Sequence, residues 1–132
     1  MKRLVIVLAA LGLAACGRVA AQPVAVDRVV LDEFSIMTEA EVWHTGSVSL
    51  EIANIGERTH TLVISGADGR VVASTDIVEP NEVVEFNVDL GPGSYQLTCR
   101  IVVEGANGQL FDHFEQGMST TVTVAKSPAT QG

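Results

Sequence analysis

Apolar and polar residues alternate with a period of two along most of the chain after residue 24. The clearest alternation covers residues 48–52 and 84–90. This pattern is typical of β-strands with one face buried. Further strand-like segments are predicted at 26–36, 60–64, 70–73, 95–103 and 120–124, separated by turns rich in Gly, Asn and Pro. The pattern therefore predicts an all-β fold, an antiparallel Greek-key sandwich or barrel of about seven or eight strands.

The N-terminal segment has the pattern of an export signal. Lys2 and Arg3 precede an apolar run that ends at Ala15 and is too short to cross a bilayer as a helix. The end of this run, Leu13-Ala14-Ala15-Cys16, resembles the lipobox of bacterial lipoproteins, in which the signal is cut before the cysteine and the cysteine is acylated. We expect Cys16 to be a lipid anchor, the alternative being an ordinary signal cleaved after small residues.

The chain of 132 residues is long enough for one domain of ordinary size. We expect a signal peptide at 1–15, a lipidated cysteine and short tether at 16–23, a folded domain at 24–126 and a disordered tail at 127–132. A protein of this organisation would be exported and held by its lipid on a membrane, facing the periplasm or the cell exterior.

The charge of the chain excludes one class of partner. The formal net charge is −8 and the sequence contains no basic cluster, so a nucleic-acid backbone would be repelled. The sequence also contains no P-loop, dinucleotide-binding fingerprint or paired-cysteine zinc motif. We expect a monomer whose acidic surface suits transient encounters with a basic partner protein.

Four residues carry the chemistry that the sequence suggests. They occur along the chain in the order His60, Cys99, His113 and Met118. Two imidazoles, a thiolate and a weak axial thioether form the donor set of a mononuclear blue-copper site. If Cys16 is lipidated, Cys99 has no cysteine left to pair with.

Strand parity predicts that two of these donors point inward. His60 shares a strand face with Leu62, and Cys99 shares one with Leu97. A buried histidine can instead be a neutral, hydrogen-bonded core residue, and a lone cysteine can be a small buried hydrophobe. Parity alone leaves both interpretations open.

The same residues lie within a pattern that resembles the cupredoxins. The matching segments are Asn54-x-Gly56-x-x-x-His60, Pro80, Leu90-Gly91-Pro92-Gly93-x-Tyr95-x-x-x-Cys99, and His113 with Gly117-Met118. The resemblance implies one type 1 copper ion, with His60 and His113 supplying imidazole nitrogens, Cys99 the thiolate and Met118 the axial sulfur. It also implies that Asn54 and Gly56 form the turn that delivers His60, and that Tyr95 is structural, as in a tyrosine corner.

The spacing departs from this family in one place, because thirteen residues separate Cys99 from His113 and predict an inserted hairpin. A tight turn at Asn107-Gly108 would leave His113 roughly 10 Å along the strand from the position opposite Cys99. A five-residue loop at 104–108 would place His113 directly opposite Cys99. The sequence does not choose between these two registers.

These features predict a mononuclear copper-binding, membrane-anchored electron-transfer protein of the cell envelope, which serves a redox partner protein and is not an enzyme. One alternative is a copper capture or delivery protein that uses the same donors. Another is a cupredoxin-like binding or structural module that carries no metal.

Overall fold

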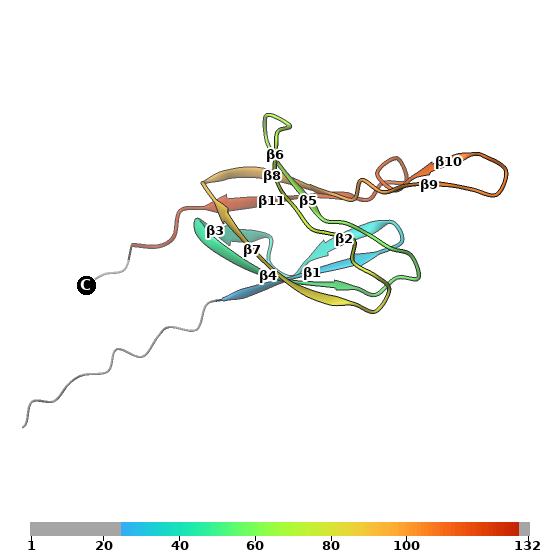
Figure 1. Cartoon of the computed structure of the whole chain (residues 1–132). Helices are drawn as coiled ribbons and strands as arrows, with labels where there is room; N and C mark the ends of the chain where they lie inside the picture. Colours follow the sequence, from blue (N-terminus) through green and yellow to red (C-terminus); the bar gives the residue numbers. More distant parts are fainter. Residues whose placement is uncertain (1–24, 130–132) are drawn as a thin grey trace, which may run out of the picture.

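Two β-sheets face each other in the computed structural model, which describes residues 25–129 (Figure 1). Across the first sheet the strands are β2 (Ser35–Thr38), β1 (Val26–Asp32), β4 (Gly46–Asn54) and β7 (Val83–Leu90). Across the second they are β3 (Val42–His44), β11 (Ser119–Ala125), β8 (Gly93–Thr98), β5 (Val63–Gly66) and β6 (Val71–Ser74). The remaining two, β9 (Val102–Glu104) and β10 (Leu110–Asp112), form a separate hairpin that projects from one end of the sandwich.

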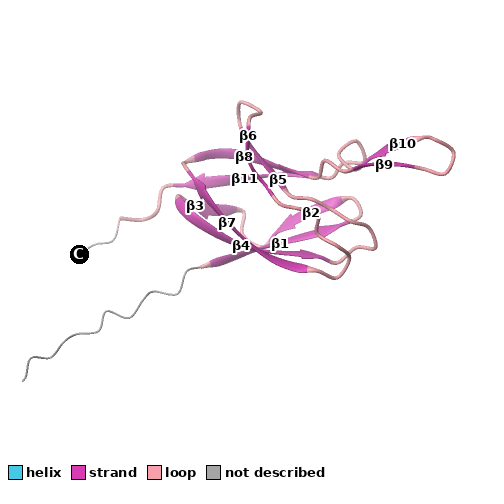
Figure 2. Cartoon of the chain, in the orientation of Figure 1, coloured by secondary structure: helices cyan, strands magenta, loops and turns pink. Residues whose placement is uncertain are grey.

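The described residues contain strands and loops and no helix (Figure 2), which confirms the predicted all-β class. Residues 25–129 form eleven strands, more than the seven or eight expected. Two of the strand pairs, β1 with β4 and β11 with β3, are parallel, so the sheets are mixed and not purely antiparallel. Within residues 25–129 no helix is long and apolar enough to cross a membrane.

The core lies between the two sheets and is formed by the apolar halves of the alternating strands. In β4 the side chains of Val48, Leu50 and Ile52 are buried, as the period of two predicts. β3 was not predicted, yet its central residue Trp43 is fully buried. This short strand lies at the edge of the second sheet, while β2 and β4, which precede and follow it in the chain, both belong to the first.

The described chain begins at the end of the sandwich opposite the β9–β10 hairpin (Figure 1). The signal peptide, the lipid anchor at Cys16 and the tether lie outside the described residues and stay predictions. At the other terminus, Ser127 hydrogen-bonds to Thr45, with its amide donating to Oγ1 at 3.1 Å and its hydroxyl donating to the carbonyl at 2.9 Å. This pair of bonds fixes the chain directly after β11, at the start of the predicted tail.

Candidate metal centre

Three of the four predicted donors meet at one buried point in the structure. Sγ of Cys99 lies 3.9 Å from Nδ1 of His60 and 3.6 Å from Nδ1 of His113. One donor atom from each of these residues lies within 4.8 Å of the other two. The side chains are 0%, 0% and 1% exposed for His60, Cys99 and His113, so solvent does not separate them. Among the described residues this is the one cluster of such groups that could hold a metal ion.

The spacing of these donors would allow all three to bind one metal ion. With metal–sulfur and metal–nitrogen bonds of about 2.3 and 2.0 Å, a trigonal arrangement separates sulfur from nitrogen by roughly 3.7 Å. The two sulfur–nitrogen distances in the structure lie on either side of this value. Two imidazoles and a thiolate in a trigonal arrangement are a donor set that suits copper.

Met118, the predicted axial donor, lies directly across from Cys99. The pairing of β8 with β11 ends at Thr98 and Ser119, and the next pair outward is Cys99 and Met118. The Cys99 amide donates to the Met118 carbonyl at 3.2 Å, and the Met118 side chain is fully buried. Directly opposed residues point to the same face of a sheet, so both sulfur-bearing side chains point into the core.

Thr61 supplies hydrogen bonds to the sulfur of Cys99. Its backbone amide donates to Sγ at 3.5 Å, and its hydroxyl lies 3.8 Å from the same atom. Hydrogen bonds of this kind withdraw electron density from a thiolate and are one means of tuning a thiolate-bound metal. No pattern in the sequence marks Thr61 as part of the centre.

The turn predicted to deliver His60 is present and is held by a buried amide. Nδ2 of Asn54 donates to the carbonyls of Arg58 and Val78, at 2.8 and 2.9 Å, and Oδ1 accepts from the amide of Gly56 at 2.9 Å. His60 then forms an isolated antiparallel bridge with Val78. It therefore precedes β5, whereas the sequence predicted a strand that began at residue 60.

Glu33, in the turn between β1 and β2, is a second residue that the sequence analysis missed. Its Oε1 lies 3.1 Å from Nε2 of His60, on the side of the ring away from Cys99. The amides of Glu57 and Arg58 donate to the same carboxylate at 3.1 and 2.8 Å. Desolvation raises the pKa of Glu33, but the hydrogen bonds from these amides and His60 outweigh it, so the pKa lies below its ordinary value.

His113 reaches Cys99 by neither of the two registers considered from the sequence. Glu104 pairs with Leu110, so the hairpin loop is 105–109, and the His113 amide bonds to the Ile101 carbonyl at 3.0 Å. The imidazole reaches Cys99 because the chain leaves the strand after residue 112 and makes a compact turn.

Asp112 and Gly117 stabilise this turn. Oδ1 of Asp112 accepts from the amides of Phe114 and Glu115, at 2.8 and 3.4 Å. Gly117 has a φ of 99°, a conformation that costs glycine little and other residues much more. The Met118 amide then donates to the His113 carbonyl at 3.1 Å, which closes the turn. The Asp112 carboxylate thus forms a turn, and does not orient the imidazole beside it in the chain.

Two phenylalanines cover the imidazole of His113. The ring centroids of Phe34 and Phe111 lie 5.1 and 6.1 Å from that of His113, and the two phenyl rings lie 5.2 Å apart. Nε2 of His113 is buried without a hydrogen-bond partner among the described residues. Burial, followed by the nearby His60 and Arg58, lowers the pKa of His113. The neutral imidazole, which can bind a metal, is therefore favoured.

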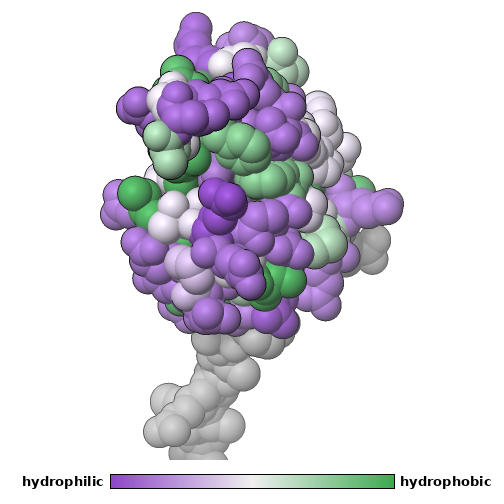
Figure 3. Space-filling model, turned by 90° about the vertical axis from the view of Figure 1, so that its right-hand side faces the viewer, coloured by the Kyte–Doolittle hydropathy of each residue, from purple (hydrophilic) through white to green (hydrophobic). Residues whose placement is uncertain are grey.

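The surface at the hairpin end is mostly polar, with smaller apolar areas between polar ones (Figure 3). A hollow of about 400 Å³ lies beside the hairpin and is lined by Arg58 and by hairpin residues from Val103 to Phe111. The third histidine, His44, is exposed at the end of β3 and takes no part in the centre. Tyr95 donates from its hydroxyl to the Gly91 carbonyl at 2.9 Å, which agrees with its predicted structural role.

Comparisons with known proteins identify the fold. No protein-family model and no curated protein sequence matches the chain. Among solved structures, Na-dithionite reduced auracyanin from Roseiflexus castenholzii has a TM-score of 0.55 and 16% identity, covering 80% of this chain and 99% of its own. Auracyanin A from Chloroflexus aurantiacus, described as a "blue" copper protein, gives 0.55 and 14%, covering 76% and 98%. Rusticyanin from Thiobacillus ferrooxidans gives 0.54 and 16%, covering 76% and 77%. With this topology and these structural neighbours, the chain has the cupredoxin fold.

Proposed function

We propose that this protein binds one copper ion through His60, Cys99, His113 and Met118 and transfers single electrons in the cell envelope. The observation that carries the proposal is the convergence of three donor atoms at a buried point. Nδ1 of His113 and Nδ1 of His60 lie 3.6 and 3.9 Å from Sγ of Cys99. The resemblance in sequence and the shared fold of the auracyanins and rusticyanin support it.

The surroundings of the donors suit electron transfer. Bound copper would supply a one-electron couple at this point. Cys99 directly follows β8 and Met118 directly precedes β11, two adjacent strands of one sheet, and the Asn54 turn holds His60, so the donors are constrained before any ion binds. A site that changes little with oxidation state needs little reorganisation when an electron is gained or lost.

Burial of the donors favours electron transfer over copper capture and delivery. A protein that passes a metal ion to another protein needs an open approach to the ion, whereas His60, Cys99 and Met118 are each 0% exposed and His113 is 1% exposed. The short distances among His60, Cys99 and His113 also argue against a metal-free module, because three such side chains have no structural need to converge.

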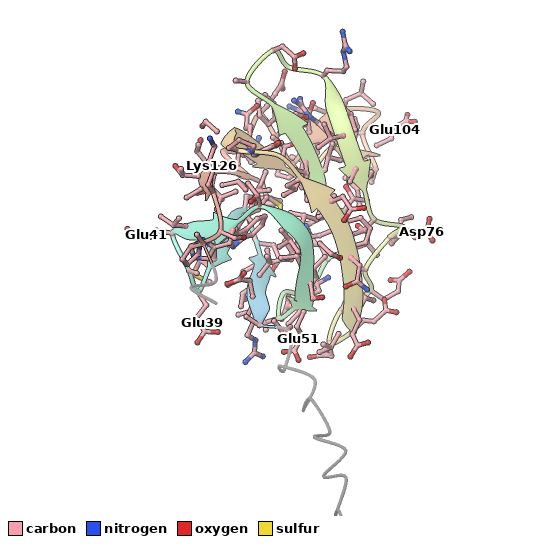
Figure 4. All side chains as sticks on the ribbon, turned by 90° about the vertical axis from the view of Figure 1, so that its left-hand side faces the viewer. Glu39, Glu41, Glu51, Asp76, Glu104 and Lys126 are labelled. Atoms are coloured by element: carbon pink, nitrogen blue, oxygen red, sulfur yellow. The ribbon has the colours of Figure 1, made fainter. Side chains whose placement is uncertain are left out.

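We further propose that a lipid on Cys16 anchors the protein and that the electron-transfer partner is a basic protein. The described chain starts at the end of the sandwich away from the candidate centre, so a tether there would point the centre away from the membrane (Figure 1). Acidic side chains point outward around the sandwich, among them Glu39, Glu41, Glu51 and Asp76 (Figure 4). Such a surface favours salt-sensitive encounters with a positively charged partner.

The two cysteines provide the test and its matched control. Adding Cu(II) to the purified protein should give an intense visible absorption with a stoichiometry of one. Cys99→Ser should abolish this colour and leave the protein in the membrane fraction. Cys16→Ser should keep the colour and release the protein from the membrane. A colourless wild-type protein would end the electron-transfer proposal, and Cu(I) binding without colour would indicate capture or delivery.

A further inference from the structure

We infer that Glu33 is a positioning residue for the metal centre, which fixes the imidazole of His60 so that Nδ1 faces the ion and which favours oxidised copper. This inference deepens the proposed function and rests on it where copper is concerned. Its structural part, the position of the proton on the His60 ring, depends only on contacts within the metal-free protein.

The contact between Glu33 and His60 determines which ring nitrogen carries the proton. Oε1 of Glu33 lies 3.1 Å from Nε2 of His60, and an ionised carboxylate can only accept a hydrogen bond. The proton of the neutral ring is therefore on Nε2. Nδ1 keeps its lone pair and lies 3.9 Å from Sγ of Cys99, on the side where an ion would bind.

The loop that precedes His60 is built around this carboxylate. The amides of Glu57 and Arg58 donate to its two oxygens, so both are occupied. Gly56 lies so close that a Cβ at this position would overlap the carboxylate of Glu33. The Glu33 side chain is 24% exposed, while the His60 side chain is fully buried. Glu33 therefore reaches from the β1–β2 turn to a ring that water does not reach.

The negative charge has a consequence beyond orientation. A carboxylate that accepts the second N–H of a metal-bound imidazole raises the basicity of the coordinating nitrogen, and loss of such a partner typically lowers metal affinity about 10–100-fold. A more basic ligand stabilises Cu(II) more than Cu(I). The presence of Glu33 should therefore lower the reduction potential of the centre.

Glu33→Gln tests this inference, because it removes the charge and keeps the size of the side chain. We expect the variant to stay coloured with Cu(II), to bind Cu(II) about tenfold more weakly and to lose less affinity for Cu(I). Each tenfold difference between the two losses raises the potential by about 59 mV. Glu57→Gln is the matched control, since its exposed side chain carries the same charge in the contacting loop without touching His60. Equal potentials and affinities in the two variants would overturn the inference.

A second measurement needs neither copper nor a variant. Nitrogen-15 NMR of the metal-free protein should show His60 with its proton on Nε2, and a proton on Nδ1 would overturn the inference even if Glu33→Gln failed to fold. If the wild-type protein gave no copper colour but showed the Nε2 proton, the proposed electron transfer would fail while the positioning role of Glu33 stood.

Discussion

Replacement of Asn54 should destabilise the metal-free protein far more than an ordinary polar substitution. Its side chain is 1% exposed and makes three hydrogen bonds, two through Nδ2 to the carbonyls of Arg58 and Val78 and one through Oδ1 to the amide of Gly56. These bonds shape the segment between β4 and His60. Asn54→Ala removes all three and leaves buried backbone groups without a partner.

The magnitude follows from the number and burial of these bonds. A buried hydrogen bond contributes about 1 kcal/mol net, and a group left unpaired in the interior costs about 1–3 kcal/mol. The Val78 carbonyl keeps the His60 amide as a donor, at 3.1 Å. Loss of its bond to Asn54 should therefore cost an amount at the lower end of this range. We expect Asn54→Ala to lower the free energy of unfolding by about 3 kcal/mol.

Asn54→Asp sharpens the prediction, since it keeps the size and shape of the side chain. It retains an acceptor for the Gly56 amide but places a carboxylate oxygen against two carbonyl oxygens. We expect it to be at least as destabilising as Asn54→Ala. Asn87→Ala is the control, because that exposed amide is bonded only to the hydroxyl of Ser49 and should cost at most about 0.5 kcal/mol.

Urea unfolding of the metal-free variants, with a common slope against urea concentration, measures these differences. The reasoning would be refuted if Asn54→Asp were as stable as wild type, since the donors of the amide would then not matter. It would also be refuted if Asn54→Ala cost no more than Asn87→Ala. A secondary expectation is weaker Cu(II) binding by both Asn54 variants, because the turn positions His60.

Three further predictions concern the centre itself. Met118→Leu, a replacement of similar volume in the core, should cost less than about 1.5 kcal/mol in unfolding while shifting the reduction potential in voltammetry; an unchanged potential would remove Met118 from the donor set. Burial lowers the pKa of His113 from its ordinary 6.5, so the folded state binds fewer protons, and urea unfolding of the metal-free protein should show stability falling as the pH drops below that value. His113→Gln should remove this pH dependence. The variant should still lose stability below pH 4.5, because the pKa of Glu33 is also lower in the folded state than its ordinary value. Phe111→Ala should admit water to His113 and raise its pKa, measurable by NMR titration, whereas Leu110→Ala, 68% exposed, should not.

Local alternation along the chain was sufficient to predict part of this molecule. The buried face of β4 and the half-buried face of β7 follow from the period of two, and so does the inward direction of His60 and Cys99. β3 was not predicted, because three residues are too few to show a period. The parallel pairing of β1 with β4 was not predicted, because no turn joins the two strands directly and no local signal marks them as neighbours.

The route of the chain from Cys99 to His113 could not be predicted from hairpin geometry. Counting residues back from a turn assumes that both strands continue to the site, and here the second strand ends at Asp112. Aspartate and glycine are both residues that favour turns, so Asp112 and Gly117 contained the information. It was outweighed by the expectation of a regular ladder.

Glu33 left no such signal, and the reason lies in the architecture of the centre. Glu33 comes from a turn of the first sheet, and His60 lies on the segment that passes from one sheet to the other. Cys99 and Met118 adjoin the ends of β8 and β11 in the second sheet. The donors and their carboxylate partner meet only when the two sheets pack. An ion would therefore bind only the folded protein. It should stabilise the whole sandwich by RT ln(1 + [L]/Kd), where [L] is the free ion concentration and Kd its dissociation constant, and separation of the sheets should release it.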